Sequence, residues 1–290
     1  MIVVSNTFIP AIKRKKGVGG KNQIQIAQSD AGDVAYYSPT RKYNDSEDDE
    51  NDFDDSDFIS QNEFFREKPV QSITGAEWMP FFKDRMTMFI SGTPGAGKSY
   101  LAKKMINLLP DNLDILLFTA LEEKDGNFDD IKPERLFKIK MTPEVLSSIT
   151  LKEIRERAKS PQTILLFDDI DKIRDPKIQS LTFAVMNDAL ANGRGHEKHD
   201  GKGDLHVLCT SHSTNDYNKT KYTFENSNYV ALFPGTTPPL QMYRMFDKLG
   251  LDKELCKQLI HMARQQKIRS IIIHKVVPMY LIFGDKIMLL

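Results

Sequence analysis

A glycine-rich turn carries the clearest chemical signal in the sequence. Residues 92–99 match the pattern G-x-x-x-x-G-K-[ST] directly after the apolar segment Met86–Ser91 and directly before a helical pattern. Glycines let such a turn fold its backbone N–H groups around an anion, and the helix N-terminus adds partial positive charge. The pattern therefore predicts a phosphate-binding loop, or P-loop, formed by Gly92, Thr93, Pro94, Gly95, Ala96, Gly97, Lys98 and Ser99.

Two residues at the end of this loop have separate predicted roles. Lys98 is expected to reach the β and γ phosphates of ATP as a positive point charge and to be required for hydrolysis. The Ser99 hydroxyl is expected to bind Mg²⁺. The expected cofactors are therefore ATP and Mg²⁺.

A second chemical signal is the acidic end of an apolar segment. Thr163–Phe167 is followed by Asp168 and Asp169, in the manner of a Walker B motif. Asp168 is the candidate for the Mg²⁺ shell, and Asp169 for polarising the attacking water. Asp171 is expected to be a surface residue or to lie where the next helix begins. The alternative for the Asp168–Asp169 pair is a solvated strand end.

The segment Leu205–Thr210 also ends in polar residues, Ser211 and His212. Either side chain is placed to contact the attacking water or the terminal phosphate, and His212 is the stronger candidate for this sensor role. A purely structural histidine is the alternative. His196 and His199 lack cysteines or carboxylates at ligand spacing, so they do not indicate a metal site.

From about residue 76 the sequence alternates short apolar runs with longer amphipathic segments, which predicts an α/β domain over residues 76–290 with a central, mostly parallel sheet flanked by helices. The predicted strands of this sheet are Met86–Ser91, Ile115–Thr119, Thr163–Phe167, Leu205–Thr210 and Tyr229–Phe233. The predicted helices are Ser99–Leu109, Leu151–Lys159, Lys177–Leu190, Leu240–Leu249 and Lys253–Gln266. A C-terminal strand meander is predicted over Ser270–Lys275, Met279–Phe283 and Lys286–Leu290.

Residues 1–75 are expected to form a flexible, largely disordered arm, because they offer little apolar surface to bury. Nine acidic residues and no basic ones lie between positions 45 and 57. Setting these nine aside leaves 31 acidic residues against 40 basic ones, an excess that suits a nucleic-acid partner. A solubilising tail on an ordinary surface is the alternative.

The two cysteines, Cys209 and Cys256, lie far apart in apolar surroundings and are expected to be reduced core residues. No run of 18 or more apolar residues occurs, and the first residues lack the apolar segment of a secretory signal. A soluble, intracellular protein without a membrane segment is expected.

Taken together, these motifs resemble the FtsK–HerA superfamily of P-loop ATPases, and within it the poxvirus-like genome-packaging ATPases of large double-stranded DNA viruses. The resemblance covers Arg85 to Leu290 and includes Asn192-Gly193-Arg194-Gly195-His196 ahead of the sensor strand. It implies an ATP-driven translocase of double-stranded DNA that forms a homo-oligomeric ring and works with capsid or other virion proteins. It also implies location at the host-cell assembly site and in the virion.

The resemblance further implies that Arg194 enters the neighbouring subunit's site as an arginine finger, with Arg174 as the fallback candidate and a simple surface arginine as the alternative. The sequence departs from the family at His212, where a glutamine is usual, and in the longer, more charged loop 195–203. Lys198 and Lys202 in that loop are candidates for DNA contact together with Arg194.

Other P-loop enzymes remain open as alternatives: an AAA-type loader or helicase, or a small-molecule kinase. The strand-rich C-terminus argues against a loader with a lid domain. A GTPase is disfavoured because Asn218-Lys219-Thr220-Lys221 does not complete the base-reading pattern Asn-Lys-x-Asp. A non-enzymatic nucleotide-binding scaffold fits poorly with the paired carboxylates Asp168 and Asp169.

Overall fold

The computed structural model of the chain describes residues 12–14, 24–29, 34–37, 78–82, 85–119, 127–158, 162–195, 203–212, 217–276, 279–284 and 286–289. The chain divides into two compact units. One comprises Phe82–Val277, and the other combines Met1–Phe81 with Pro278–Leu290. The P-loop and the other candidate site residues all belong to the unit Phe82–Val277.

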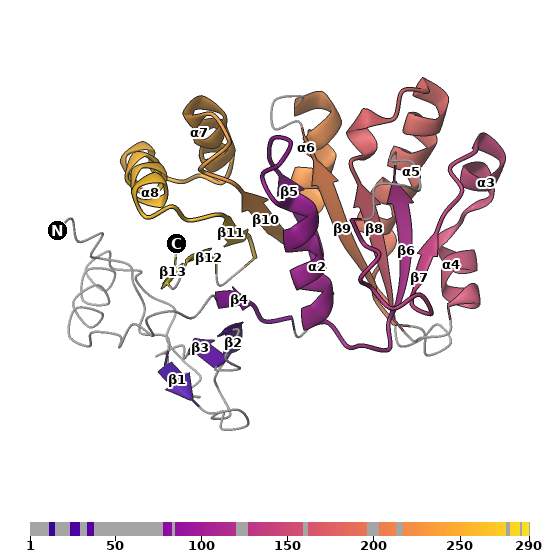
Figure 1. The fold of residues 1–290 in the computed structure, drawn as a ribbon, viewed down its shortest axis with the longest axis horizontal. Coiled ribbons are helices and arrows are strands. Elements are labelled where there is room, and N and C mark those ends of the chain that lie inside the picture. The colour runs from indigo at the N-terminus through magenta and orange to yellow at the C-terminus, as the bar shows by residue number, and fades with distance from the viewer. Residues whose placement is uncertain are drawn as a thin grey trace, which may run out of the picture. The chain divides into compact units, whose positions relative to one another are not determined.

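A twisted sheet forms the centre of this larger unit (Figure 1). Neighbouring strands pair in parallel from β10 through to β7, whereas β11 pairs with β10 antiparallel. In spatial order the strands are β11 (Ile271–His274), β10 (Tyr229–Leu232), β5 (Thr87–Ser91), β9 (Leu205–Ser211), β8 (Thr163–Asp168), β6 (Asp114–Thr119) and β7 (Leu136–Lys138).

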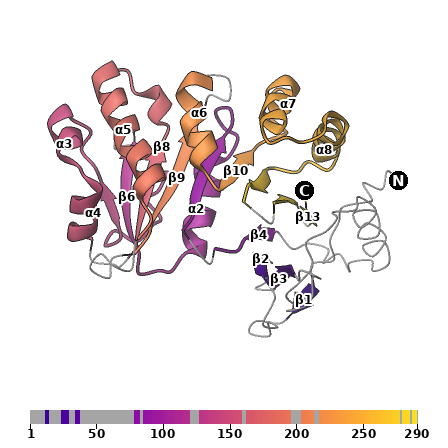
Figure 2. The same ribbon diagram turned by 180° about the vertical axis from the view of Figure 1, so that it is seen from behind.

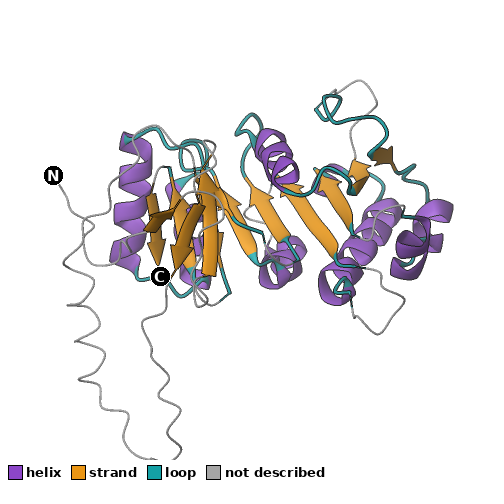
Figure 3. Ribbon diagram, turned by 90° about the horizontal axis from the view of Figure 1, so that it is seen from below, coloured by secondary structure: helices purple, strands orange, loops and turns teal. Residues whose placement is uncertain are grey.

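Helices cover both faces of this sheet (Figure 3). Helix α2 lies on the face toward the viewer in Figure 1, and α6 lies on the opposite face, toward the viewer in Figure 2. The helices are α2 (Lys98–Leu108), α3 (Pro143–Ser148), α4 (Leu151–Arg157), α5 (Pro176–Asn192), α6 (Tyr217–Asn226), α7 (Pro239–Lys248) and α8 (Lys253–Gln265), with a 3₁₀ turn η1 (Ile170–Lys172) between β8 and α5.

The central strands are buried on both sides, as the continuous apolar runs of the sequence predict. Every residue of β5, β8 and β9 is buried. Between β6 and β8, the rings of Phe118 and Phe167 stack with centroids 4.6 Å apart. Each such side chain contributes roughly 1.5–3 kcal/mol when it is removed from water, so the strands that carry the site residues are firmly held.

The order of the strands creates a switch point between β5 and β9. The chain runs from β5 through α2 to β6, which lies beyond β9 in the strand order. It runs from β9 through α6 to β10, which lies in the opposite direction, beyond β5. Loops that diverge in this way open a crevice at the carboxyl edge of the sheet, which is where ligands bind in open α/β folds. The P-loop and His212 both lie at this edge, because they follow β5 and β9 directly.

The smaller unit contains an antiparallel sheet in the order β1-β3-β2-β4, formed by β1 (Ile12–Arg14), β3 (Val34–Tyr37), β2 (Ile24–Ser29) and β4 (Trp78–Pro80). Strands β12 (Tyr280–Phe283) and β13 (Lys286–Leu289) form an antiparallel pair. Within this unit the Tyr280 hydroxyl donates a hydrogen bond to the Ile26 carbonyl at 2.8 Å. Three of these strands fall inside the predicted arm, whereas the acidic run 45–57 lies outside the described residues.

The predicted fold class is confirmed, with its mostly parallel sheet, flanking helices and antiparallel C-terminal strands. The five predicted strands and five predicted helices begin and end within two residues of the prediction. The sequence reasoning did not predict β1, β4, β7, α3 or α6. The division into residues 1–75 and 76–290 stays a prediction.

Candidate functional site

The P-loop leaves β5 in a conformation that its glycines permit. Gly95 and Gly97 have φ angles of 76° and 99°, in the left-handed region that favours glycine. A Cβ on Gly92 would lie 2.7 Å from Cδ2 of the Phe233 ring, so only glycine allows this close approach. The Gly92 N–H donates to the Ser211 carbonyl at 3.1 Å, which fastens the start of the loop to the end of β9.

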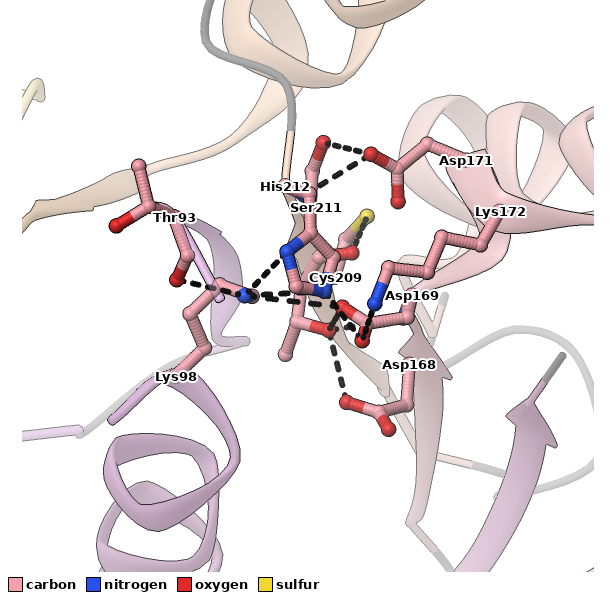
Figure 4. Close-up of polar contacts among 10 residues, drawn as sticks. Thr93, Lys98, Asp168, Asp169, Asp171, Lys172, Cys209, Ser211 and His212 are labelled. Atoms are coloured by element: carbon pink, nitrogen blue, oxygen red, sulfur yellow. Dashed lines mark hydrogen bonds and ion pairs between the residues drawn. The ribbon is translucent and has the colours of Figure 1, made fainter. Parts of the chain in front are cut away.

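Lys98, the first residue of α2, points into the carboxyl edge of the sheet (Figure 4). Its ammonium group donates to the Thr93 carbonyl at 3.3 Å and lies 3.2 Å from Nδ1 of His212 and 3.9 Å from Oδ1 of Asp169. Burial lowers the pKa of Lys98, and the neighbouring carboxylate of Asp169 opposes that shift. Ser99 follows in the same first turn and is half-buried.

Asp168 ends β8 and is almost fully buried. The Thr210 hydroxyl, on the neighbouring strand β9, donates to Oδ1 of Asp168 at 2.8 Å. Burial raises the pKa of Asp168 to about 6, because the charged carboxylate loses water, and the Thr210 hydrogen bond offsets only part of this effect. A buried carboxylate with one protein donor is suited to binding a cation.

Asp169 begins the turn after β8 with a φ of 51°, a conformation that Asp tolerates better than most residues with a side chain. Its N–H donates to the Thr210 hydroxyl at 2.9 Å, which holds this backbone in place. Its Oδ2 lies 2.6 Å from Nε2 of His212 and 3.5 Å from the Lys172 ammonium. Asp169 is therefore directed toward the end of β9 and toward the P-loop lysine.

Asp171 was expected to be a surface residue or to lie where the next helix begins, and it lies in η1, ahead of α5, with specific partners. Its Oδ2 accepts hydrogen bonds from the His212 N–H at 2.9 Å and from the Ser211 hydroxyl at 3.1 Å (Figure 4). Asp171 thus ties the 3₁₀ turn after β8 to the end of β9. A third carboxylate two residues after the acidic pair was the available signal in the sequence, but its partners could be known only from the strand order.

Arg194 lies at the amino edge of the parallel strands, where β9 begins. It follows α5, and the Gly193 carbonyl beside it accepts from the N–H of Leu205, the first residue of β9. Because β9 spans seven residues, at about 3.3 Å per residue its two ends are roughly 20 Å apart. Arg194 therefore cannot be brought together with Lys98 of the same chain, and its role as a finger stays a prediction.

The backbone around Arg194 is held by other arginines. Arg155 of α4 donates to the carbonyls of Asn192 and Arg194, at 3.3 and 3.1 Å. Arg85 donates to carbonyls at the end of α5 and to Leu205, and a Cβ on Gly193 would lie 2.6 Å from its Nη2. The same Cβ would lie still closer to the Ala189 carbonyl oxygen, and this backbone atom, more than the flexible Arg85 side chain, requires glycine at this position.

The remaining candidates divide into two groups. Arg174 is exposed and lies between η1 and α5, on the carboxyl edge of the sheet. His196, His199, Lys198 and Lys202 lie outside the described residues.

Cys209 and Cys256 are buried and free, as predicted. In the described part of the chain, no helix is both long enough and apolar enough to cross a membrane.

The fold and this arrangement of residues resemble those of P-loop ATPases, as the motifs predicted. Residues 88–225 match the family described as ATPase family associated with various cellular activities (AAA). The matched range begins in β5 and ends in α6, so it includes residues 92–99, Asp168, Asp169 and His212.

More particularly, the chain is 23% identical over 207 residues to "Uncharacterized protein V3" of the Sputnik virophage, covering 69% of this chain and 76% of the relative. Among solved structures it is similar to the genome packaging NTPase B204 of Sulfolobus turreted icosahedral virus 2, with 16% identity, a TM-score of 0.39, and coverage of 66% of this chain and 91% of that one. It is also similar to the type VII secretion ATPase EccC of Thermomonospora curvata, with 10% identity and a TM-score of 0.41, covering 94% of this chain but only 30% of that one.

Proposed function

We propose that the chain is an ATP-driven translocase of double-stranded DNA that packages a viral genome into a capsid. The observation that carries the ATPase part is the convergence of Lys98, Asp169 and His212 within 4 Å of one another at the carboxyl edge of the sheet. The DNA-packaging part is supported by the motif resemblance and by the excess of basic residues outside the acidic run.

The residues of the loop fit ATP and Mg²⁺. The glycines leave no Cβ where Gly95 and Gly97 turn, and the first turn of α2 presents its N–H groups beside Lys98. Within the described ranges, no three His, Cys, Asp or Glu side chains group closely enough to hold a metal ion by themselves. Ser99 and Asp168 would therefore hold Mg²⁺ together with phosphate oxygens, as Mg²⁺ in nucleotide sites prefers. When bound, the ion neutralises charge that develops on the phosphates.

The distance between Arg194 and Lys98 along the sheet supports an assembly of several copies. A finger that lies roughly 20 Å from its own site, by the length of β9, acts only on the site of a neighbouring copy. Contacts of this kind join two different surfaces and close into a ring when the rotation permits. We therefore propose a homo-oligomeric ring in which Arg194 of each subunit stabilises charge on the γ-phosphoryl group bound by the next one.

The test is ATP hydrolysis with and without duplex DNA, together with the particle mass by light scattering. The proposal predicts hydrolysis that duplex DNA stimulates, by particles with the mass of a ring. An AAA-type loader or helicase would instead respond to a partner protein or to single strands. A small-molecule kinase would be a monomer or dimer, and its turnover would require a phosphate acceptor other than water. Docking on capsid or other virion proteins would appear as co-sedimentation with capsids.

A further inference from the structure

We infer that Thr210 is a positioning residue for both aspartates that follow β8, fixing the carboxylate of Asp168 for Mg²⁺ binding and holding the backbone turn of Asp169. This inference rests on the proposed ATP hydrolysis. Thr210 lies in β9 and is fully buried, so it acts through the two aspartates and does not touch the nucleotide itself. The sequence reasoning considered only Ser211 and His212 at the end of this segment.

A single buried oxygen joins the two aspartates. The Thr210 hydroxyl lies 2.8 Å from Oδ1 of Asp168 and 3.2 Å from Oδ1 of Asp169, and it accepts a hydrogen bond from the Asp169 N–H at 2.9 Å. A hydroxyl has one proton, so only one of the two carboxylate oxygens can receive it. The shorter contact assigns that proton to Asp168, because hydrogen bonds between oxygens are most often about 2.7–2.8 Å long. Thr210 is thus a donor to one aspartate and an acceptor from the other.

For Asp168, the hydroxyl sets the direction of the carboxylate. Asp168 is almost fully buried, and among the described residues Thr210 supplies the hydrogen bond that its side chain accepts. Carboxylates that bind metal ions are oriented by outer hydrogen bonds of this kind, and the loss of one costs about 10–100-fold in metal affinity or activity. Without the hydroxyl, the Asp168 carboxylate would lose this fixed orientation.

For Asp169, the hydroxyl holds an uncommon backbone conformation. The φ of Asp169 is 51°, and its buried N–H has the Thr210 oxygen as its acceptor. Because the Thr210 proton goes to Asp168, Thr210 donates no hydrogen bond to Oδ1 of Asp169, and the Lys98 ammonium lies 3.9 Å from that oxygen. This oxygen is therefore able to accept a hydrogen bond from the attacking water, which is the role that the sequence suggests for Asp169.

The place of Thr210 in the sheet explains why its hydroxyl can hold two other residues. Strand β9 pairs with β5 on one side, where Thr210 lies opposite Ile90, and with β8 on the other. The side chain is branched at Cβ and has few rotamers. The hydroxyl is therefore in place before nucleotide binds, and the two aspartates need no reorganisation.

The deciding variants are Thr210→Val, which removes the hydroxyl at nearly constant shape, and Thr210→Ser, which keeps it. Two measurements separate the two aspartates. The gain in affinity for a fluorescent ATP analogue on adding Mg²⁺ tests Asp168 without turnover, and kcat at saturating Mg²⁺ and ATP tests Asp169. For Thr210→Val we expect both values to fall by about 10–100-fold. Thr210→Ser should recover most of both losses.

Thr87→Val is the matched control. Thr87 is equally buried on the adjacent strand β5, where its hydroxyl donates to the Asn226 carbonyl at 3.3 Å and accepts from the Asn228 N–H at 2.8 Å. The variant loses one donor and one acceptor, as Thr210→Val does, but at the opposite end of the strands. We expect a comparable fall in melting temperature, with the Mg²⁺-dependent gain in affinity and kcat unchanged.

A loss below about tenfold in both measurements for Thr210→Val, less than an outer hydrogen bond contributes, would overturn the inference and leave the ATPase intact. Equal losses in Thr210→Ser or in Thr87→Val would overturn it as well. A loss in one measurement alone would overturn the part assigned to the other aspartate. Absence of hydrolysis by the unchanged protein would overturn the proposed function, whereas the Mg²⁺ measurement would still test Asp168. If Thr210→Val does not fold, as judged by its melting curve, Thr210→Ala is compared with Thr210→Ser by the same criteria.

Discussion

The side chains of Lys98 and His212 lie 114 positions apart in the sequence and meet at 3.2 Å between Nζ and Nδ1. One belongs to the loop after β5 and the other to the loop after β9, which are adjacent parallel strands. Asp169 reaches the same point from the end of β8. Three separate loops thus meet at one position at the carboxyl edge of the sheet.

Asp168 should reduce the stability of the protein when nucleotide is absent. Its folded-state pKa of about 6 lies above the ordinary value near 3.8, so the folded state favours the neutral carboxyl. The protein is therefore most stable at low pH in this respect, and its free energy of unfolding falls as pH rises through 6. Asp168→Asn should therefore be more stable than the unchanged protein at pH 8, by at most about 3 kcal/mol. The gain should shrink toward pH 5. Urea unfolding at the two pH values measures this, and equal stability of the two proteins at pH 8 would contradict it.

Gly92→Ala should damage the P-loop through packing. The added Cβ would lie 2.7 Å from the buried Phe233 ring, and overpacking of this kind costs about 1–3 kcal/mol. We expect a lower melting temperature and weaker nucleotide binding. Gly235→Ala is the control, because no atom lies within 4 Å of the added Cβ and its φ is not in the left-handed region. A similar loss of stability in both variants would show that the packing argument is wrong.

Asp171→Ala should slow turnover without much change in nucleotide affinity. It removes the acceptor for the His212 N–H and the Ser211 hydroxyl, so the end of β9 loses its fixed position. A fall in kcat of about tenfold is expected for a positioning defect of this kind. Asp171→Asn should recover most of the rate, because its amide oxygen can accept both bonds. Steady-state kinetics separates kcat from KM, and equal defects in the two variants would exclude the role.

Arg194→Ala should reduce turnover by about 10³-fold or more if the residue acts as a finger. Mixed with Lys98→Ala subunits, it should regain activity. A site on an Arg194→Ala subunit can receive the intact arginine of a Lys98→Ala neighbour, at about a quarter of the interfaces in an equal mixture. Arg174→Ala subunits in the same mixture test the fallback candidate. Activity that stays at the level of the separate variants would count against a finger at Arg194.

The central sheet and the P-loop were predictable because their signals are local. Each buried strand is a continuous apolar run, and residues 92–99 carry their motif within eight positions. Strand β7 has only three residues, α3 has six, and α6 is a mixed polar segment, so none of the three gives a clear periodic pattern.

The site was predictable only in part, for a different reason. The types of Asp168, Asp169 and His212 pointed to their chemistry, but their mutual contacts depend on β9 lying between β5 and β8. The role of Asp171 depends on the same strand order. The separation of Arg194 from Lys98 follows from the direction of α5, which returns the chain to the opposite edge of the sheet.

The most direct test of the account is ATP turnover by the unchanged protein and by Lys98→Ala, measured with Mg²⁺ present. Lys103→Ala is the matched control, because Lys103 lies on the same helix and pairs with the exposed Asp130. The account predicts that Lys98→Ala loses hydrolysis and keeps its fold, while Lys103→Ala hydrolyses ATP normally and changes stability by no more than about 1 kcal/mol. Normal turnover by Lys98→Ala would contradict the assignment of Gly92–Ser99 as the nucleotide site.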